Sequence, residues 1–234
     1  MSSLILRAKG PMQSWAVDSR YSTRESGREP SKSGIVGLLA AALGRSREED
    51  VSDLAELRMG TRTDQPGRLL VDFHTAKAPG SKHSTLSWRH YLSDAAFTVA
   101  VSGDDSLIRQ IAEAVSAPRF PLFLGRRACP APVDLMGGVF DVDDTECILR
   151  DLDRTPWLAS GWYRQQSVRQ VYLSISRDAE PGEPGDLVRD VPLSFDPRQR
   201  DYGSRIIARC EPLLVGNPQG RELDDPFFAL VKED

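Results

Sequence analysis

Residues 10–15 carry side chains suited to nucleic-acid binding. A Gly-Pro turn exposes backbone groups, Gln13 offers both a donor and an acceptor, and Trp15 offers a flat ring on which a base can stack. The alternative is that Trp15 anchors the following loop in the protein core. The segment therefore predicts either a nucleic-acid contact or a core anchor.

Two further clusters are suited to holding phosphate groups. Arg24, Lys32 and Ser33 lie around the start of an expected helix, where free N–H groups and a partial positive charge attract anions. After Gly125, which permits close approach of a ligand, two adjacent arginines can grip a phosphate through paired hydrogen bonds. Serine-rich helix starts are also common caps, and adjacent arginines are often merely solvated. The GxxxxGK[ST] spacing of a nucleotide-hydrolysing loop is absent from the sequence.

The histidines His74, His83 and His90 fall close together in the sequence, and Tyr91 follows them directly. One of them is a candidate general base on an RNA 2′-hydroxyl, with a lysine such as Lys77 stabilising the phosphorane. Their spacing is not that of the HxxxH or HExxH metal motifs. The sequence therefore predicts no catalytic residue, no metal and no cofactor, with metal-independent RNA cleavage as the alternative.

The composition is that of a globular protein. Of 234 residues, 40% are hydrophobic and 27% are charged, and no apolar run approaches the roughly 20 residues that cross a membrane. Cys129, Cys147 and Cys210 are too far apart for a CxxC metal pair. We therefore expect a soluble, cytoplasmic chain with free or buried thiols and no membrane partner.

Charge is distributed unevenly along the chain, although the net charge is only −4. Residues 1–132 contain 18 basic and 14 acidic residues, which gives +4, whereas residues 133–234 contain 12 and 20, which gives −8. Arginine supplies 25 of the 30 basic residues, and its planar guanidinium suits phosphate contacts and base stacking. A GC-rich genome would produce the same arginine excess without any function. The first half is the candidate for binding a polyanion.

The segments that must position these clusters alternate between strand-like and helix-like patterns. Alternating apolar residues predict strands at 3–8, 68–75, 95–101 and 120–124. Two stretches with one apolar face predict helices, the first capped by Ser33 and ended by Gly44, the second capped by Asp104 or Asp105 and ended before Pro118. This order is the ferredoxin-like (RRM-like) βαββαβ arrangement, an antiparallel sheet with two helices on one face and the other face open.

Beyond residue 132 the pattern changes to short strands separated by turns. Residues 170–176, 187–195 and 204–209 have strand-like patterns, and a cluster of proline and glycine lies at 180–185. We therefore expect an α+β chain, with a ferredoxin-like domain at 1–132 and a smaller β-rich subdomain at 133–234. A protruding hairpin is expected at about 76–88.

Five segments together resemble one known family. Residues 6–15 and 30–44 resemble the N-terminal signature of the Cas-five-type subunits of the RAMP superfamily, the CasD subunits of type I-E CRISPR Cascade complexes. The resemblance continues in the same order through residues 71–75, 88–99 and 120–130. It spans most of the chain.

This resemblance implies an RNA-binding, non-catalytic subunit of a Cascade surveillance complex, a ribonucleoprotein of antiviral defence. Such a subunit holds the repeat-derived 5′ handle of the CRISPR RNA (crRNA) and caps one end of the complex. It contacts the backbone subunit and the large subunit that reads the protospacer-adjacent motif (PAM), and meets target DNA only indirectly. The loop at 76–88 corresponds to a hairpin thumb that presses on the RNA. One related subtype cleaves precursor RNA with its Cas-five-type subunit, whereas type I-E uses a separate endonuclease.

The residues predicted to contact RNA come from three loops and the thumb. Basic residues grip phosphates, and Trp15 or Trp88 packs on displaced bases. These loops are expected to converge beside the open face of the sheet. The set is Gln13, Trp15, Arg24, Lys32, Ser33, Trp88, Arg89, Gly125, Arg126 and Arg127.

Overall fold

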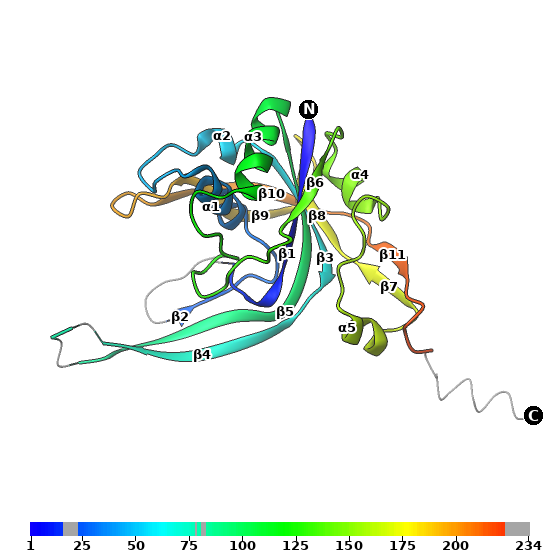
Figure 1. The fold of residues 1–234 in the computed structure, drawn as a ribbon, viewed down its shortest axis with the longest axis horizontal. Coiled ribbons are helices and arrows are strands. Elements are labelled where there is room, and N and C mark those ends of the chain that lie inside the picture. Colours follow the sequence, from blue (N-terminus) through cyan, green and yellow to red (C-terminus); the bar gives the residue numbers. More distant parts are fainter. Residues whose placement is uncertain (16–22, 78, 81–82, 223–234) are drawn as a thin grey trace, which may run out of the picture.

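The computed structural model describes residues 1–15, 23–77, 79–80 and 83–222. It is a mixed α/β fold whose main sheet has the strand order β6-β1-β5-β3-β8-β10-β9 (Figure 1). All neighbours in this order are antiparallel. The strands are β1 (Ser2–Gln13), β3 (Arg58–Gln65), β5 (Thr85–Gly103), β6 (Met136–Phe140), β8 (Ile175–Asp178), β9 (Asp186–Ser194) and β10 (Asp201–Arg209).

Four further strands complete the β-structure. The strands β2 (Thr23–Arg24) and β4 (Arg68–Ala76) both pair with the first part of β5, while β7 (Gln170–Leu173) and β11 (Leu213–Gly216) form a separate two-stranded sheet. The helices are α1 (Lys32–Leu43), α2 (Ser52–Ala55), α3 (Asp105–Ser116), α4 (Thr145–Arg150) and α5 (Gly161–Gln166). No helix in the described part of the chain is long and apolar enough to cross a membrane.

Capping residues set the ends of the two long helices. The α3 cap is Asp104, one of the two predicted candidates, and its carboxylate accepts hydrogen bonds from the N–H groups of Ser106 and Leu107. The α1 cap is Ser31, whose side chain accepts from Gly34, so the prediction of Ser33 was wrong by two residues. At the other end of α1, Gly44 has a φ of +83°, the left-handed conformation that suits a helix C-terminus.

One face of the sheet packs on α1 and α3. Alternate residues of β1 and β5 point to this face, and the residues between them point to the opposite one. They meet the apolar stripe of α3 in one buried core. Its central members are Leu4, Leu6, Phe97, Val99, Ile35, Leu39, Ile108 and Ile111.

The opposite face of the sheet is covered, so the prediction of an open face was wrong. Ile5 and Ala100 point to this face and are buried against Ile148 and Leu149 of α4. Beside them Arg62 is fully buried, and its guanidinium donates to the carbonyl oxygens of Leu149, at 2.6 Å, and of residues 155 and 156. Segment 145–160, which the sequence pattern left unassigned, therefore seals the surface on which bases were expected to stack.

Two of the predicted strands differ in the structure. Residues 120–124 do not form a strand, and the edge position beside β1 is taken by β6, from beyond residue 132. The partner of β5 on its other side is β3, which the sequence pattern missed because polar and small residues dominate it. The sheet then continues through β8, β10 and β9, so it crosses residue 132 without interruption.

A long hairpin projects from the body at 68–93 (Figure 1), and we call it the thumb. It consists of β4 and the first part of β5, so β5 extends well before the predicted strand start at 95. The predicted loop at 76–88 covers only its tip and one arm. Residues 78, 81 and 82 of that loop lie outside the described part of the chain.

Candidate nucleic-acid interface

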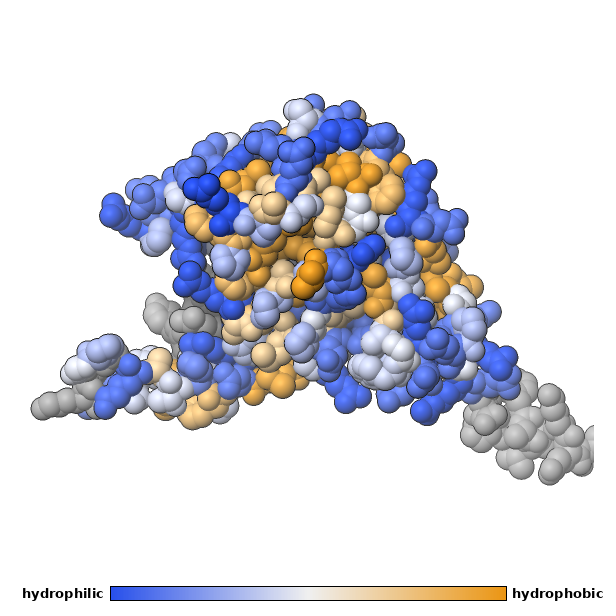
Figure 2. Space-filling model, in the orientation of Figure 1, coloured by the Kyte–Doolittle hydropathy of each residue, from blue (hydrophilic) through white to orange (hydrophobic). Residues whose placement is uncertain are grey.

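A groove of about 630 Å³ runs along α1 and has three walls from distant parts of the sequence. The first wall is α1 with the turn that follows it, the second is the segment 120–127, and the third is the β9–β10 turn at 195–202. Figure 2 shows apolar side chains gathered on this face of the molecule, between the lobe that carries α1 and the thumb. The groove is therefore a surface feature that joins the first half of the chain to the second.

The second wall is fastened to α1 at one end and to β1 at the other. The N–H groups of Arg119 and Phe120 donate to the carbonyl oxygens of Ala42 and Ala41, at 3.0 and 3.2 Å, and so satisfy the free end of the helix. Further on, the N–H of Ser14 donates to the carbonyl of Leu124 at 3.1 Å. These bonds place residues 120–127 alongside the helix.

Gly125 is the residue that lets this wall approach β1 so closely. Its φ is +86°, and a Cβ at this position would lie 1.7 Å from the carbonyl oxygen of Ser14. No other residue fits, because both the backbone conformation and the space exclude a side chain. The predicted role of Gly125 in close approach is thus observed toward the protein's own backbone.

Arg126 and Arg127, the predicted arginine pair, lie in the groove wall but differ in their surroundings. The Arg126 guanidinium lies over the ring of Tyr91, 5.0 Å from its centre, and donates to the carbonyl of His90 at 3.2 Å. Arg126 therefore joins the groove to the base of the thumb. Arg127 is exposed, and no described residue forms an ion pair with it.

The groove has a strongly positive lining. Five arginines line it, and no acidic residue is among the described residues that do so. Arg45 is held by two bonds of 2.5 Å to the carboxylate of Asp53, whereas Arg47, Arg127 and Arg200 have no ion-pair partner in the described part of the chain. Like charges held together without counter-charge attract a polyanion. The five are Arg45, Arg47, Arg126, Arg127 and Arg200.

Aromatic rings line two of the same walls as these arginines. Phe120 and Phe123 belong to the second wall, and Phe195 and Tyr202 to the third. Phe120 is about half exposed. A channel that combines guanidinium groups with ring faces suits a single-stranded nucleic acid, because phosphates and bases are both accommodated.

The predicted contacts Gln13 and Trp15 are internal. Both side chains are fully buried, and the Trp15 ring nitrogen donates to the Gln13 amide oxygen at 3.0 Å. The Gln13 amide nitrogen in turn donates to the carbonyl oxygens of Ala8 and Ala95. Trp15 is therefore the core anchor of the alternative interpretation, and of this cluster only Ser14 lines the groove.

The start of α1 is occupied by a carboxylate from the second half of the chain. The N–H of Lys32 donates to Asp190 at 2.7 Å, and the Lys32 ammonium pairs with Asp178 at 3.0 Å. Both side-chain partners are buried or nearly so, which leaves Lys32 unable to reach a ligand. Of the predicted helix-start residues whose side chains the structure describes, Ser33 lines the groove and Lys32 does not.

Arg205 completes this buried ion cluster between α1 and the β9–β10 hairpin. Its guanidinium donates to Asp190 at 2.7 and 2.8 Å and to Asp178 at 2.5 Å. Burial alone would raise the pKa of Asp178, but Lys32 and Arg205 outweigh it and hold that pKa below its ordinary value. The cluster therefore carries matched charges and fixes the third wall to the helix.

The thumb carries the remaining predicted residues away from the groove floor. Trp88 is half exposed and packs against Phe73, with ring centres 4.7 Å apart. The Arg89 guanidinium donates to the Ser87 hydroxyl at 3.3 Å. Arg24 lies in β2, in register with Arg89, and its side chain is outside the described part of the structure.

The histidines do not assemble into one catalytic group. In the register of the thumb His74 pairs with Ser87 and His90 with Val71, so the two rings point to opposite faces of the hairpin. The Nδ1 atom of His74 lies 3.6 Å from Oδ2 of Asp72. Tyr91, the other candidate, is buried beneath Arg126. Within the described ranges no group of three or more histidine, cysteine or acidic residues is placed to hold a metal.

Several groove residues were missed by the sequence reasoning. Arg45 and Arg47 directly follow the glycine that ends α1, which was the available signal for them. Phe195, Arg200 and Tyr202 come from the acidic half of the chain, where no ligand contact was expected. Only the packing of the β9–β10 hairpin on α1 brings them to the groove.

Comparison with known proteins identifies relatives over nearly the whole chain. The family described as "CRISPR-associated protein (Cas_Cas5)" matches residues 3–207. The CRISPR system Cascade subunit CasD of Escherichia coli (strain K12) is 36% identical over 202 residues, which cover 77% of this chain and 88% of that protein.

Two solved structures share the fold. A chain of a CRISPR RNA-guided surveillance complex has a TM-score of 0.73 at 29% identity and covers 98% of each chain. A second, described as the crystal structure of a Cas protein, has a TM-score of 0.65 at 34% identity and covers 94% of this chain and 98% of its own. The chain therefore belongs to the Cas5 family of CRISPR-associated proteins, in the type I-E group represented by CasD.

Proposed function

We propose that this protein is the Cascade subunit that holds the repeat-derived 5′ handle of the crRNA and caps one end of the complex, in antiviral defence. The observation that carries the proposal is the groove along α1, where four aromatic rings line one channel with three arginines that have no ion-pair partner among the described residues. A single RNA strand offers the phosphates and bases that such a channel accepts. The relationship to CasD of Escherichia coli supports the placement in Cascade.

The proposed contact set follows the groove. It retains Ser33, Gly125, Arg126 and Arg127 from the sequence prediction, and it omits Gln13, Trp15 and Lys32 because their side chains are engaged inside the protein. Trp88 and Arg89 of the thumb, with Arg24 beside them, remain proposed contacts for RNA that leaves the groove at Arg126. Arg45 and Arg47 are added from the far end of α1.

The proposal also covers partners and architecture. The backbone subunit and the large PAM-reading subunit are the proposed protein neighbours, target DNA is met through them, and the complex acts in the cytoplasm. Strands β6-β1-β5-β3 with α1 and α3 form the proposed ferredoxin-like unit, and the division at residue 132 remains a prediction. We propose that this chain binds RNA without cleaving it.

Binding by the full-length purified chain tests the proposal. The probe is a fluorescein-labelled single-stranded RNA of the host CRISPR repeat, titrated by fluorescence anisotropy between 50 and 200 mM salt. With about five phosphates engaged, the log-log slope is expected near −3.5, which is roughly a hundredfold loss of affinity over this range. A slope near zero would exclude the electrostatic mechanism.

Matched variants separate the groove from general surface charge. Arg127→Ala is expected to weaken binding about tenfold and to make the slope shallower by about 0.7. Arg109→Ala removes another exposed arginine, on α3 and outside the groove, and should leave the affinity and the salt slope unchanged. Equal losses in the two variants would contradict the proposed site. The RNA should be intact on a denaturing gel after prolonged incubation, and cleavage would revive the nuclease alternative.

A further inference from the structure

The β9–β10 turn brings an arginine from the acidic half of the chain to the groove. Phe195, Arg200 and Tyr202 line the wall opposite segment 120–127. Phe195 lies against α1, because a Cβ at Gly37 would be only 3.5 Å from its ring. The turn is therefore in contact with α1, the first wall of the groove.

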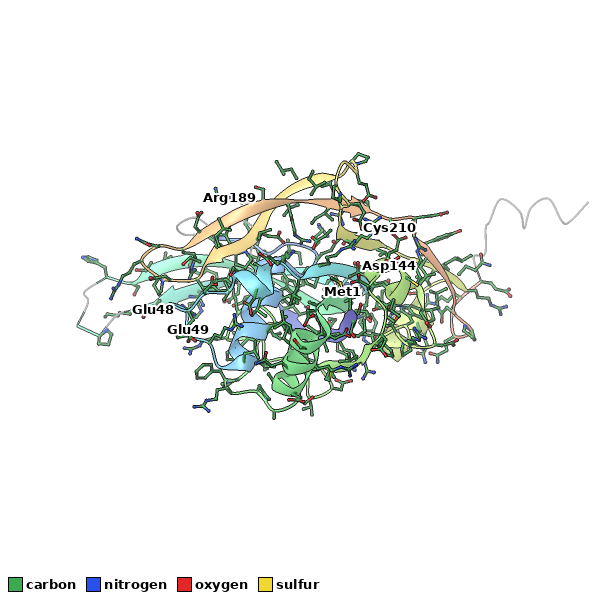
Figure 3. All side chains as sticks on the ribbon, turned by 90° about the horizontal axis from the view of Figure 1, so that it is seen from above. Met1, Glu48, Glu49, Asp144, Arg189 and Cys210 are labelled. Atoms are coloured by element: carbon green, nitrogen blue, oxygen red, sulfur yellow. The ribbon has the colours of Figure 1, made fainter. Side chains whose placement is uncertain are left out.

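The position of the turn along α1 follows from two contacts of the strand before it. Asp190 binds the backbone of Lys32 at the start of the helix, and Phe195 meets Gly37 near its middle. The chain of β9 thus runs along α1 in the same direction, and residues 196–200 lie level with the C-terminal half of the helix. Figures 1 and 3 agree, since the turn lies at the same end of the molecule as the loop with Glu48 and Glu49.

The groove consequently has two basic ends. Segment 120–127 begins at the last turn of α1, to which Phe120 is bonded, and its Gly125 reaches Ser14. Since the neighbouring Trp15 ring lies against Gly34 in the first turn of α1, Arg127 lies toward the start of the helix, while Arg47 follows its end. A helix of 12 residues at 1.5 Å per residue separates these ends by about 18 Å. One phosphate cannot span that distance, so a ligand that uses both ends must be a chain of several phosphates.

Within the turn, Arg200 is the basic residue that faces the groove. Asp201 is paired with Arg189 at 3.2 Å, and the Asp196 side chain accepts from the backbone of Arg198, so both acidic groups have partners within the hairpin. Arg189 lies on the outer side of the hairpin, away from α1 (Figure 3). Arg200 has no ion-pair partner in the described part of the chain.

We infer that the β9–β10 turn is a second RNA-backbone contact, in which Arg200 holds a phosphate at the end of the groove near Arg47. The RNA then passes between two walls that come from opposite halves of the chain. The inference rests on the proposed function and adds to it a contact from the acidic half of the chain, where the sequence predicted none. The buried cluster around Asp190 positions this contact by fixing the hairpin to α1.

The test compares two arginines of the same turn in the full-length protein, with the same labelled repeat RNA. Arg200→Ala is expected to weaken binding about tenfold and to make the salt slope shallower by about 0.7, the effect of one lost phosphate contact. Arg198→Ala removes the same charge two residues away, from a side chain that does not line the groove, and should bind as the wild type does. Arg200→Lys should restore the slope, because the charge returns.

The outcomes distinguish a failure of this inference from a failure of the proposed function. If the wild type binds and Arg127→Ala weakens it, but Arg200→Ala binds normally, the groove holds RNA without the turn and the inference is overturned. Equal losses in Arg200→Ala and Arg198→Ala would also overturn it, because they indicate a diffuse field and not a contact. If the wild type itself shows no binding, the proposed function fails and the inference falls with it. Thermal melts that match the wild type confirm that the variants are folded.

Discussion

Replacing Asp190 by alanine should destabilise the protein more than the same replacement of a surface carboxylate. Asp190 is only 3% exposed and accepts three hydrogen bonds, one from the backbone of Lys32 and two from the guanidinium of Arg205. Alanine leaves the first N–H of α1 without its acceptor. It also leaves buried Arg205 with Asp178 as its remaining acidic partner.

The size of the effect follows from the cost of an uncompensated buried charge. Removing one member of a buried ion cluster costs about 3 to 5 kcal/mol. For a chain of this length, each kcal/mol lowers the melting temperature by roughly 2 to 4 °C, so a shift on the order of 10 °C is expected. RNA affinity should fall as well, because the third wall of the groove loses its link to α1.

Urea unfolding followed by circular dichroism measures the effect. The control is Asp186→Ala, on the same strand, where the carboxylate pairs with Arg209 at 3.1 Å but is largely exposed. An exposed pair contributes about 1 kcal/mol or less, so this variant should be near wild type. An Asp190→Ala loss below about 1 kcal/mol would show that the cluster does not hold the hairpin and would refute the reasoning.

Three further predictions concern the backbone, the thiols and pH. Gly125→Ala should cost roughly 2 kcal/mol in urea unfolding and weaken RNA binding, because a Cβ clashes at a positive φ, whereas Gly161→Ala should be neutral, since nothing lies within 4 Å of the added atom. With a disulfide reagent at about pH 8, the exposed Cys147 thiol should react fast and the Cys210 thiol slowly. The reason is that burial and a neighbouring carboxylate raise the pKa of Cys210 to about 11. Equal rates would contradict this. The pKa of Asp178 is lowered in the fold, so its contribution to the free energy of unfolding is complete above about pH 4 and is lost as the pH falls through the folded-state pKa. The difference in stability between wild type and Asp178→Asn should therefore narrow below about pH 4. A difference that stays constant with pH would contradict this.

The sequence predicted best those features that depend on neighbouring residues. The end of α1 at Gly44 and the cap of α3 at Asp104 are confirmed, because both are set by interactions within one helical turn. The thumb was also expected in its place, since the polar residues near 80 separate two apolar stretches. Its extent was underestimated, because β5 continues without a break from the thumb into the sheet.

Features that depend on distant residues were not predictable in this way. Strand β3 carries Arg62 and Asp64, which are polar and yet fully buried, and no alternation rule assigns such residues to a central strand. They are compatible with burial only because segment 145–160 supplies acceptors such as the carbonyl of Leu149. The same segment covers the face that was expected to be open. One missing tertiary contact thus explains both errors.

The site shows the same division between local and distant information. Gly125 and the two arginines after it line the groove, and they were predicted as contacts because their chemistry is visible in three consecutive residues. Trp15 has the same chemical suitability for stacking, yet its ring nitrogen binds Gln13 and its ring contacts Gly34 inside the core. Residue type therefore indicated what each side chain can do, whereas burial decided which of them can meet a ligand.

The acidic balance of residues 133–234 need not repel RNA, because the direction of each charge matters more than their sum. Asp190 and Asp178 point inward, where they neutralise Lys32 and Arg205, and so their charge is largely cancelled before it reaches the groove. Arg200, from the same hairpin, points into the groove with no acidic partner among the described residues. A segment with a net charge of −8 can therefore present a positive surface to a polyanion at one point. The stability of the buried cluster and the affinity of the groove are then linked through one hairpin, and this is why Asp190→Ala should weaken both.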